Sequence, residues 1–298
     1  MSSLSDVRQE QLHKVGLDPQ EVAALISRAI AEDLNGGVDV TSVATVPADQ
    51  SSTLDLVARS HGVAAGVVVA SAVFDIVGQG RVQVLSSVHD GQVLKPGTVV
   101  LSATGPTIDL LTGERTALNL LCHLSGIATL TSQWVSAIAG TGAAIRDTRK
   151  TTPGLRALEK FAVRCGGGTN HRMSLSDAAL VKDNHVVAAG GVQQAFDLVR
   201  AQWPALDVEV EVDSMDQLDE VLAAGADLVL LDNFTVDQTR MAVERTAGRA
   251  RLESSGGLSL DVAHAYAQTG VDYLAVGALT HSAPVLDIGG DLQPLTEA

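Results

Sequence analysis

The segment DVEVEVDSMDQLDEVLAAGADLVLLD (207–232) decides the fold class, because two short apolar runs flank a stretch with helical periodicity. The runs DVEVE (207–211) and LVLLD (228–232) start 21 residues apart, and each of them ends in an acidic residue. This spacing leaves room for one strand and one helix, the repeating unit of a parallel sheet. The segment therefore predicts consecutive βα units.

The same pattern continues on both sides of this segment. Hydrophobic residues make up 46% of the chain but aromatic residues only 3%, which is typical of an aliphatic core around a buried parallel sheet. The sequence predicts an α/β chain with an incomplete, TIM-like parallel α/β barrel. Further strands are expected at AAIRD (143–147), AALVK (178–182), RLESS (251–255) and DYLAVG (272–277), with helices over 214–224, 235–247 and 259–268.

The first 138 residues have a different organisation. Asp18-Pro19-Gln20-Glu21 is a capping-box pattern with proline at the first helical position, and it predicts the first helix of the chain. Strands are expected over 52–58 and 81–88, a helix over roughly 66–77, a strand-turn-strand unit over 89–105, and two helices over 107–138 that break near Ser125-Gly126.

Composition restricts the possible partners and the compartment. A formal net charge of −15 argues against general binding to nucleic acid or anionic membranes. No segment approaches the roughly 20 uninterrupted apolar residues of a membrane span. The two cysteines, Cys122 and Cys165, fit no disulfide framework and no metal-ligand spacing. We therefore expect a cytoplasmic protein.

One segment departs from the acidic composition. Residues 146–182 contain eight lysines and arginines against three acidic residues, which predicts a binding site for a small polyanion. We interpret Arg156, Lys160 and Arg164 as the solvated face of a helix. The remaining basic residues fall in glycine- or proline-containing stretches and form the candidate site.

Polar residues or glycines follow nearly every predicted strand. Catalytic groups of parallel barrels lie at the carboxyl ends of the strands, so we expect these residues to meet at one edge of the barrel. They are Arg149 and Lys150, Lys182, Glu211, Asp232, Ser255-Gly256-Gly257, and Gly277.

The residue types at these positions indicate two kinds of binding. Arg149, Lys150, His171, Arg172 and Lys182 form a cationic set that suits a ligand with several carboxylates or phosphates. The glycine-rich ends of the last two strands suit a phosphate group, because glycine lets backbone N–H groups approach it closely.

Two acidic residues complete the candidate site. Glu211 and Asp232 end neighbouring predicted strands, where paired carboxylates can hold Mg²⁺ or stabilise positive charge on a sugar ring. The alternative is that these acids only cap the helices that follow. Both interpretations remain open from the sequence.

Several long motifs together resemble those of the quinolinate phosphoribosyltransferase family. The resemblance extends from about Leu17 to Ile288. The motifs are RDTRKTTPGLRALEKFAVRCGGGTNHRMSLSDAALVKDNHV (146–186), GERTALNLLCHLSGIAT (113–129), VEVEVDS (208–214), LLDN (230–233), LESSGGL (252–258) and YLAVGALTHS (273–282).

The resemblance implies a fold, an assembly and a reaction. It implies an N-terminal α+β sandwich domain (1–125) that the C-terminal tail (284–298) joins, a barrel domain (126–283), and an obligate homodimer in which Arg115 reaches the neighbouring site. The implied reaction uses quinolinate, phosphoribosyl pyrophosphate and Mg²⁺, and yields nicotinate mononucleotide, pyrophosphate and CO₂.

The resemblance also implies individual roles. Arg149, His171, Arg172 and Lys182 would bind the quinolinate carboxylates, Lys150 would bind the phosphoribosyl donor, Glu211 and Asp232 would face the ribose and Mg²⁺, and Ser255, Gly256, Gly257 and Gly277 would bind the 5-phosphate. Lys150, Lys182, Glu211 and Asp232 would be the catalytic residues.

Three alternatives remain. The chain could be a related phosphoribosyltransferase with another acceptor. It could be a sugar-phosphate aldolase that forms a Schiff base on Lys182. It could also be a binding scaffold in which Lys95 carries a modification, because Lys95-Pro96-Gly97 lies in a predicted turn.

Overall fold

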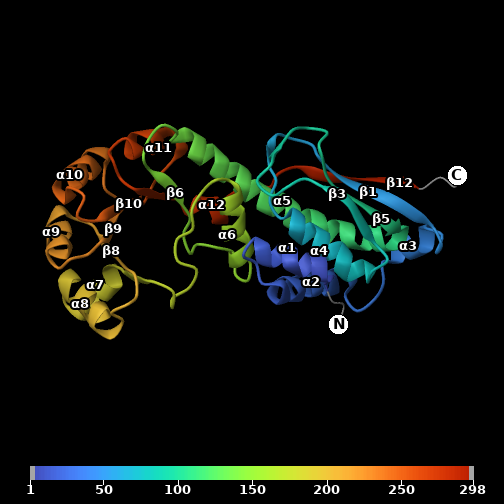
Figure 1. Cartoon of the computed structure of the whole chain (residues 1–298), viewed down its shortest axis with the longest axis horizontal. Coiled ribbons are helices and arrows are strands. Elements are labelled where there is room, and N and C mark those ends of the chain that lie inside the picture. The colour runs from blue at the N-terminus through green and yellow to red at the C-terminus, as the bar shows by residue number, and fades with distance from the viewer. Residues whose placement is uncertain (1–3, 295–298) are drawn as a thin grey trace. The chain divides into compact units, whose positions relative to one another are not determined.

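The computed structural model describes residues 4–294, and these divide into two compact units (Figure 1). The second unit comprises Thr131–Arg156 and Gly168–Ser282, and the first comprises the described residues up to Leu130, Ala157–Gly167 and those from Ala283 onward. Residues 157–167 therefore belong to the first unit, although they lie inside the expected barrel domain in sequence. The last four residues of the expected tail, 295–298, lie outside the described residues.

The second unit is built on a six-stranded sheet in which every pairing is parallel. The order is β6-β11-β10-β9-β8-β7, so β6 and β7 are the end strands of the described sheet. This confirms the predicted incomplete barrel. The strands are β6 (Ala144–Arg146), β7 (Ala179–Val181), β8 (Val208–Val212), β9 (Leu228–Asp232), β10 (Arg251–Ser255) and β11 (Tyr273–Ala275).

Helices alternate with these strands along the chain. Ser214 and Thr235 cap α9 and α10, each accepting a hydrogen bond from a backbone N–H in the first turn, as expected for hydroxyl side chains at this position. The three predicted helices are confirmed as α9 (Met215–Ala223), α10 (Val236–Thr246) and α11 (Leu260–Ala267). The sequence analysis did not predict α7 (Asp183–Ala189), α8 (Val192–Gln202) or α12 (Ala278–His281).

The first unit contains a four-stranded antiparallel sheet in the order β12-β1-β5-β3. Its last strand comes from the end of the described chain and pairs with β1 from Ser52↔Pro294 to Ala58↔Ile288. The strands are β1 (Ser51–Ala58), β3 (Gln83–Ser87), β5 (Val99–Pro106) and β12 (Ile288–Pro294), with a separate pair of β2 (Gly62–Val63) and β4 (Val93–Leu94).

The helices of this unit include an apolar one whose predicted bounds are nearly correct. All but two residues of α4 are buried, so the helix forms part of the core. The helices are α1 (Asp6–Lys14), α2 (Pro19–Leu34), α3 (Val40–Thr45), α4 (Val67–Gly78) and α6 (Arg156–Cys165), together with the start of α5 (Thr107–Ala137).

The predicted break near Ser125-Gly126 is wrong, because α5 is continuous from Thr107 to Ala137. Gly126 is required for packing rather than for a break: a Cβ atom there would collide with the carbonyl oxygen of Pro284. The Ser125 hydroxyl accepts a hydrogen bond from the backbone N–H of Ala65 at 3.0 Å. Both residues therefore serve tertiary contacts within the first unit.

Three further local predictions need correction. The helix at Pro19 is not the first, because α1 precedes it with Leu12 as its one buried residue, too little apolar patterning to signal a helix. Within 89–105, β4 pairs with β2 rather than with β5. Lys160 does not lie on a solvated face: its side chain is buried, because α6 packs inside the first unit.

Candidate active site

A cavity of about 750 Å³ opens in the second unit at the carboxyl ends of the parallel strands. All of the predicted site residues except Arg115 line it. They are Arg149, Lys150, His171, Arg172, Lys182, Glu211, Asp232, Ser255, Gly256, Gly257 and Gly277. Arg115 is exposed on α5 in the first unit.

The two acidic residues at this edge do not cap helices. Glu211 lies near the end of β8 and Asp232 is the last residue of β9, while Ser214 and Thr235 are the capping residues of the helices that follow. Glu211 forms an ion pair with the ammonium group of Lys182, the residue directly after β7. The capping interpretation is therefore wrong, and both carboxylates remain available to the cavity.

The loop after β10 passes very close to the loop after β9. Gly256 has a φ of +90°, and a Cβ atom there would collide with the side chain of Asn233. Only glycine avoids both the strained backbone and the collision. The backbone N–H of Asn233 donates to the carbonyl of Ser255 at 2.9 Å, which ties the two loops together.

Two arginines lie close together in the cavity. Burial lowers the pKa of the Arg172 guanidinium, and the neighbouring positive charge of Arg149 lowers it further. The Nε atoms of both arginines are buried and have no hydrogen-bond partner among the described residues. Like charges with unused donors indicate a site that is completed by an anionic ligand.

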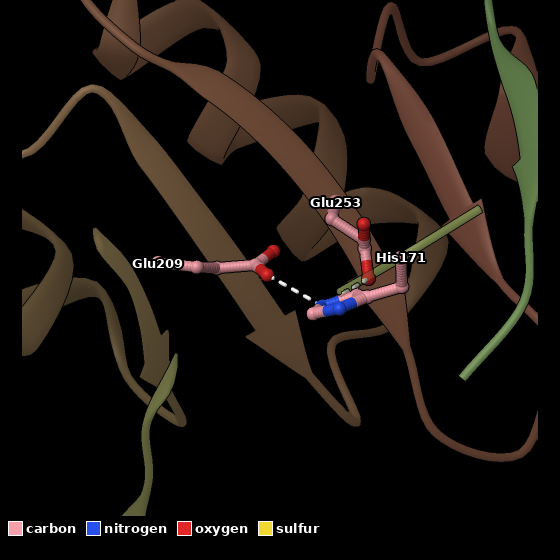
Figure 2. Close-up of side chains that lie close together, drawn as sticks. All are labelled: His171, Glu209 and Glu253. Carbon is pink, nitrogen blue, oxygen red and sulfur yellow. Dashed lines mark ion pairs between the residues drawn. The ribbon is translucent and has the colours of Figure 1, made fainter. Parts of the chain in front are cut away.

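His171 belongs to a group of buried charged residues, of which sequence reasoning missed Glu209 and Glu253. Figure 2 shows that the side chains of His171, Glu209 and Glu253 point toward one another. The Nε2 atom of His171 is 2.6 Å from a carboxylate oxygen of Glu209 and 3.9 Å from one of Glu253. The other oxygen of Glu253 accepts a hydrogen bond from Arg146 at 2.7 Å.

Asp147 fixes the backbone that carries His171. One carboxylate oxygen of Asp147 accepts a hydrogen bond from the His171 backbone N–H at 2.8 Å, and the other accepts one from the Asn170 side chain at 2.5 Å. Asp147 is fully buried, so these bonds are shielded from water. The segment before the cationic residue Arg172 is thereby held in place.

The alternation of side chains along each strand predicts which residues belong to this buried group. Residues two apart in a strand point to the same face, so Glu209 shares a face with Glu211, and Glu253 shares one with Ser255. The strands β8 and β10 alternate in the sheet, and alternate strands of a parallel barrel fill the same interior layer. Strand alternation could therefore have identified both glutamates.

Burial raises the pKa of the Glu253 carboxyl from 4.5 to about 8, and the nearby Glu209 carboxylate adds to this effect. The folded chain thus binds this proton more tightly than the unfolded chain. The resulting stabilisation is fully present below about pH 4.5 and is lost as the pH rises toward 8.

We expect Glu253→Gln, which cannot titrate, to lack this pH dependence. Between about pH 5 and 8, the free energy of unfolding of the wild type should fall relative to the variant by on the order of 1 kcal/mol per pH unit. Urea unfolding of both proteins across this range measures the difference. Parallel stability profiles would contradict a protonated Glu253.

The comparisons with known proteins agree with this geometry. Residues 39–125 match the model of the quinolinate phosphoribosyl transferase N-terminal domain, and residues 127–291 match that of the C-terminal domain. The chain belongs to the quinolinate phosphoribosyltransferase family. No helix in the described part of the chain is long and apolar enough to cross a membrane.

Relatives and solved structures extend the match over most of the chain. The carboxylating nicotinate-nucleotide pyrophosphorylase of Mycobacterium leprae is 58% identical over 271 residues, which cover 90% of this chain and 95% of the relative. The chloroplastic enzyme of Arabidopsis thaliana is 38% identical over 287 residues, 90% of this chain and 82% of the relative. The structure of NadC from Streptococcus pyogenes matches with a TM-score of 0.90 and 40% identity, covering 94% of this chain and 99% of that one.

Proposed function

We propose that this chain is a decarboxylating quinolinate phosphoribosyltransferase of de novo NAD biosynthesis. It would transfer the ribose 5-phosphate unit of phosphoribosyl pyrophosphate to the ring nitrogen of quinolinate, and release pyrophosphate and CO₂. One observation carries the proposal: the cationic set and the paired acids line a single cavity in a chain of this family. The names of the relatives support the same reaction.

The cavity suits the two substrates. The unused donors of Arg149 and Arg172 favour binding of the quinolinate carboxylates, with His171 and Lys182 beside them. Lys150 lies next to Gly277, within reach of the phosphorylated donor. The loops after β10 and β11 would bind the 5-phosphate.

The reaction then follows from charge. As pyrophosphate leaves, C1 of the ribose gains positive charge, which the carboxylates of Glu211 and Asp232 stabilise. The pyridine nitrogen attacks C1 with inversion and becomes a positively charged pyridinium. The positive charge of this pyridinium stabilises the electron pair that stays on the adjacent ring carbon when its carboxylate is lost as CO₂. Fixed charges and positioning supply most of the rate enhancement.

Glu211 and Asp232 fit a magnesium ion. Mg²⁺ is commonly held by one or two carboxylates together with substrate phosphates, and these are two carboxylates on adjacent strands of the cavity. When bound, the ion would neutralise the charge that develops on the leaving pyrophosphate. We place Mg²⁺ at these residues as a proposal.

We further propose a homodimer in the cytoplasm. Arg115 is exposed and lines no part of the described cavity of its own chain, which suits a residue that reaches the site of a partner subunit. Cys122 and Cys165 are both free thiols, as is usual in a reducing compartment.

Two alternatives are less well supported. The ammonium group of Lys182 is paired with Glu211, so it is placed as a cation rather than as a Schiff-base nucleophile. Lys95 lies in a tight turn, where its backbone N–H donates to Thr98, and nothing in that turn calls for a modification. The cationic cavity favours phosphoribosyl transfer over both.

Incubation with quinolinate, phosphoribosyl pyrophosphate and Mg²⁺ is expected to give nicotinate mononucleotide, detected by mass. Nicotinate in place of quinolinate should give none, because the cavity is built for a diacid. Chelation of the metal with EDTA should remove the activity, and added Mg²⁺ should restore it. Product formed from nicotinate alone would overturn the proposal.

A further inference from the structure

The proposed reaction requires a proton that neither substrate supplies. When CO₂ leaves the ring, the carbon that carried it keeps the electron pair of the broken bond. Nicotinate has hydrogen at this carbon, so a proton must be delivered there. The following inference rests on the proposed function and asks which group in the cavity delivers this proton.

Several of the proton donors that line the described cavity are unsuited to this step or already paired. Arginine does not release its proton in proteins. The Nδ1 atom of His171 accepts a hydrogen bond from the Arg172 backbone N–H at 2.7 Å, so the ring of a neutral His171 carries its proton on Nε2. The Nε2 atom lies 2.6 Å from a carboxylate oxygen of Glu209. The ammonium group of Lys182 faces Glu211.

Glu253 differs from these groups. It lines the cavity, yet its side chain is fully buried, and its Oε1 atom has no hydrogen-bond partner among the described residues. An unpartnered, buried carboxylate oxygen would be costly to keep charged. The groups that face Glu253 are Arg146, Asp147, His171, Glu209 and Tyr273.

The surrounding charges favour a protonated carboxyl. Arg146 carries a full positive charge, and it already contacts the Oε2 atom of Glu253. Glu209 and Asp147 oppose a negative charge on Glu253, and burial adds to their effect, so the pKa of Glu253 is raised to about 8. At neutral pH the carboxyl carries a proton, and its Oε1 atom has no hydrogen-bond partner among the described residues.

We propose that the buried carboxyl group of Glu253 donates the proton that replaces the lost carboxylate on the pyridine ring. The bond between the ring carbon and the carboxylate carbon breaks, CO₂ leaves, and the electron pair stays on the ring carbon. That carbon takes the proton of Glu253 and forms the new C–H bond. Glu253 is left as a carboxylate beside Arg146, and it regains a proton from water after the product leaves.

A bound metal ion is the alternative use of this cluster, because His171, Glu209 and Glu253 offer three ligand atoms within 4.8 Å of one another. The Nε2 atom of His171 and the nearer carboxylate oxygen of Glu209 are 2.6 Å apart. Two ligands of one zinc ion at about 2.0–2.1 Å in tetrahedral geometry lie farther apart than this. The two atoms are therefore too close together to be ligands of one zinc ion.

The test separates the two chemical steps in a single turnover of the full chain. Pyrophosphate release reports phosphoribosyl transfer, and release of labelled CO₂ from the 2-carboxyl group of quinolinate reports decarboxylation. In Glu253→Gln we expect pyrophosphate release near the wild-type rate, CO₂ release slower by about 10²-fold, and accumulation of quinolinate mononucleotide. The matched control is Glu244→Gln on the exposed face of α10, which should behave as the wild type.

The wild type provides a second reading that does not depend on the variant folding. At about pH 9, above the pKa of Glu253, CO₂ release should lag behind pyrophosphate release, whereas at about pH 6 the two should coincide. A lysine donor with an ordinary pKa of about 10.4 would keep them coupled at both values. Titration of purified protein with Zn²⁺ covers the metal alternative, and stoichiometric binding lost in Glu253→Gln would overturn the proposal.

The outcomes distinguish this inference from the proposed function. If the wild type forms no nicotinate mononucleotide, the proposed function itself is wrong. If the wild type is active but CO₂ and pyrophosphate stay coupled in Glu253→Gln, or in the wild type at about pH 9, only the proton assignment is overturned.

Discussion

Lys182→Ala is expected to lower kcat/KM for quinolinate by about 10²–10³-fold, the size of effect seen when one preorganised charged contact is removed. The ammonium group lies in the cavity, paired with Glu211. Its loss removes a positive charge that would face the substrate carboxylates and leaves the charge of Glu211 without this partner. Initial rates across quinolinate concentrations measure the effect.

The matched control is Lys95→Ala, which removes a lysine from an exposed turn of the first unit. Its activity should equal that of the wild type, and the thermal unfolding of both variants should remain cooperative. Near-wild-type activity of Lys182→Ala would show that the cationic set is misassigned. Loss of activity in Lys95→Ala would instead revive the alternative of a modified lysine.

Arg115→Ala and Glu211→Ala are each expected to be nearly inactive alone and to regain activity when mixed. In a mixed dimer, the intact cavity of the Arg115→Ala subunit would receive Arg115 from its partner. Equal amounts with random exchange give half mixed dimers with one native site each, so about a quarter of the wild-type activity should return.

This experiment requires proof that the subunits exchange. A mass difference between tagged and untagged chains, read by native mass spectrometry, supplies that proof. Recovery without exchange would point to contamination, and no recovery with complete exchange would contradict a site shared between subunits. Mixing Lys182→Ala with Glu211→Ala is the matched negative control, because both changes damage the same cavity.

The sequence predicted well which residues lie at the carboxyl ends of the barrel strands, because one rule of parallel sheets determines their position. Strands that are short, apolar and evenly spaced must end at the same side of a parallel sheet. Lys182, Glu211 and Asp232 were therefore placed together by their position after predicted strands, and the cavity contains all three. Arg115 could not be placed this way, since its role depends on the family resemblance alone.

The errors arose where tertiary contacts override a local pattern. Gly126 resembles a helix breaker, but glycine is needed there because a Cβ atom would collide with the carbonyl oxygen of Pro284. Lys160 resembles a surface residue, but its helix packs inside the first unit. The rule of strand ends does not reach Glu209 and Glu253, because each lies inside its strand, two residues before Glu211 and Ser255.

The pairing of β12 with β1 has a consequence for synthesis on the ribosome. In chain order β12 follows all the other described strands, so one edge of β1 stays open until β12 has been synthesised. Open strand edges are templates for pairing with other chains, and the nascent polypeptide is exposed to this hazard until β12 emerges. The parallel sheet of the second unit, by contrast, can be completed before translation ends.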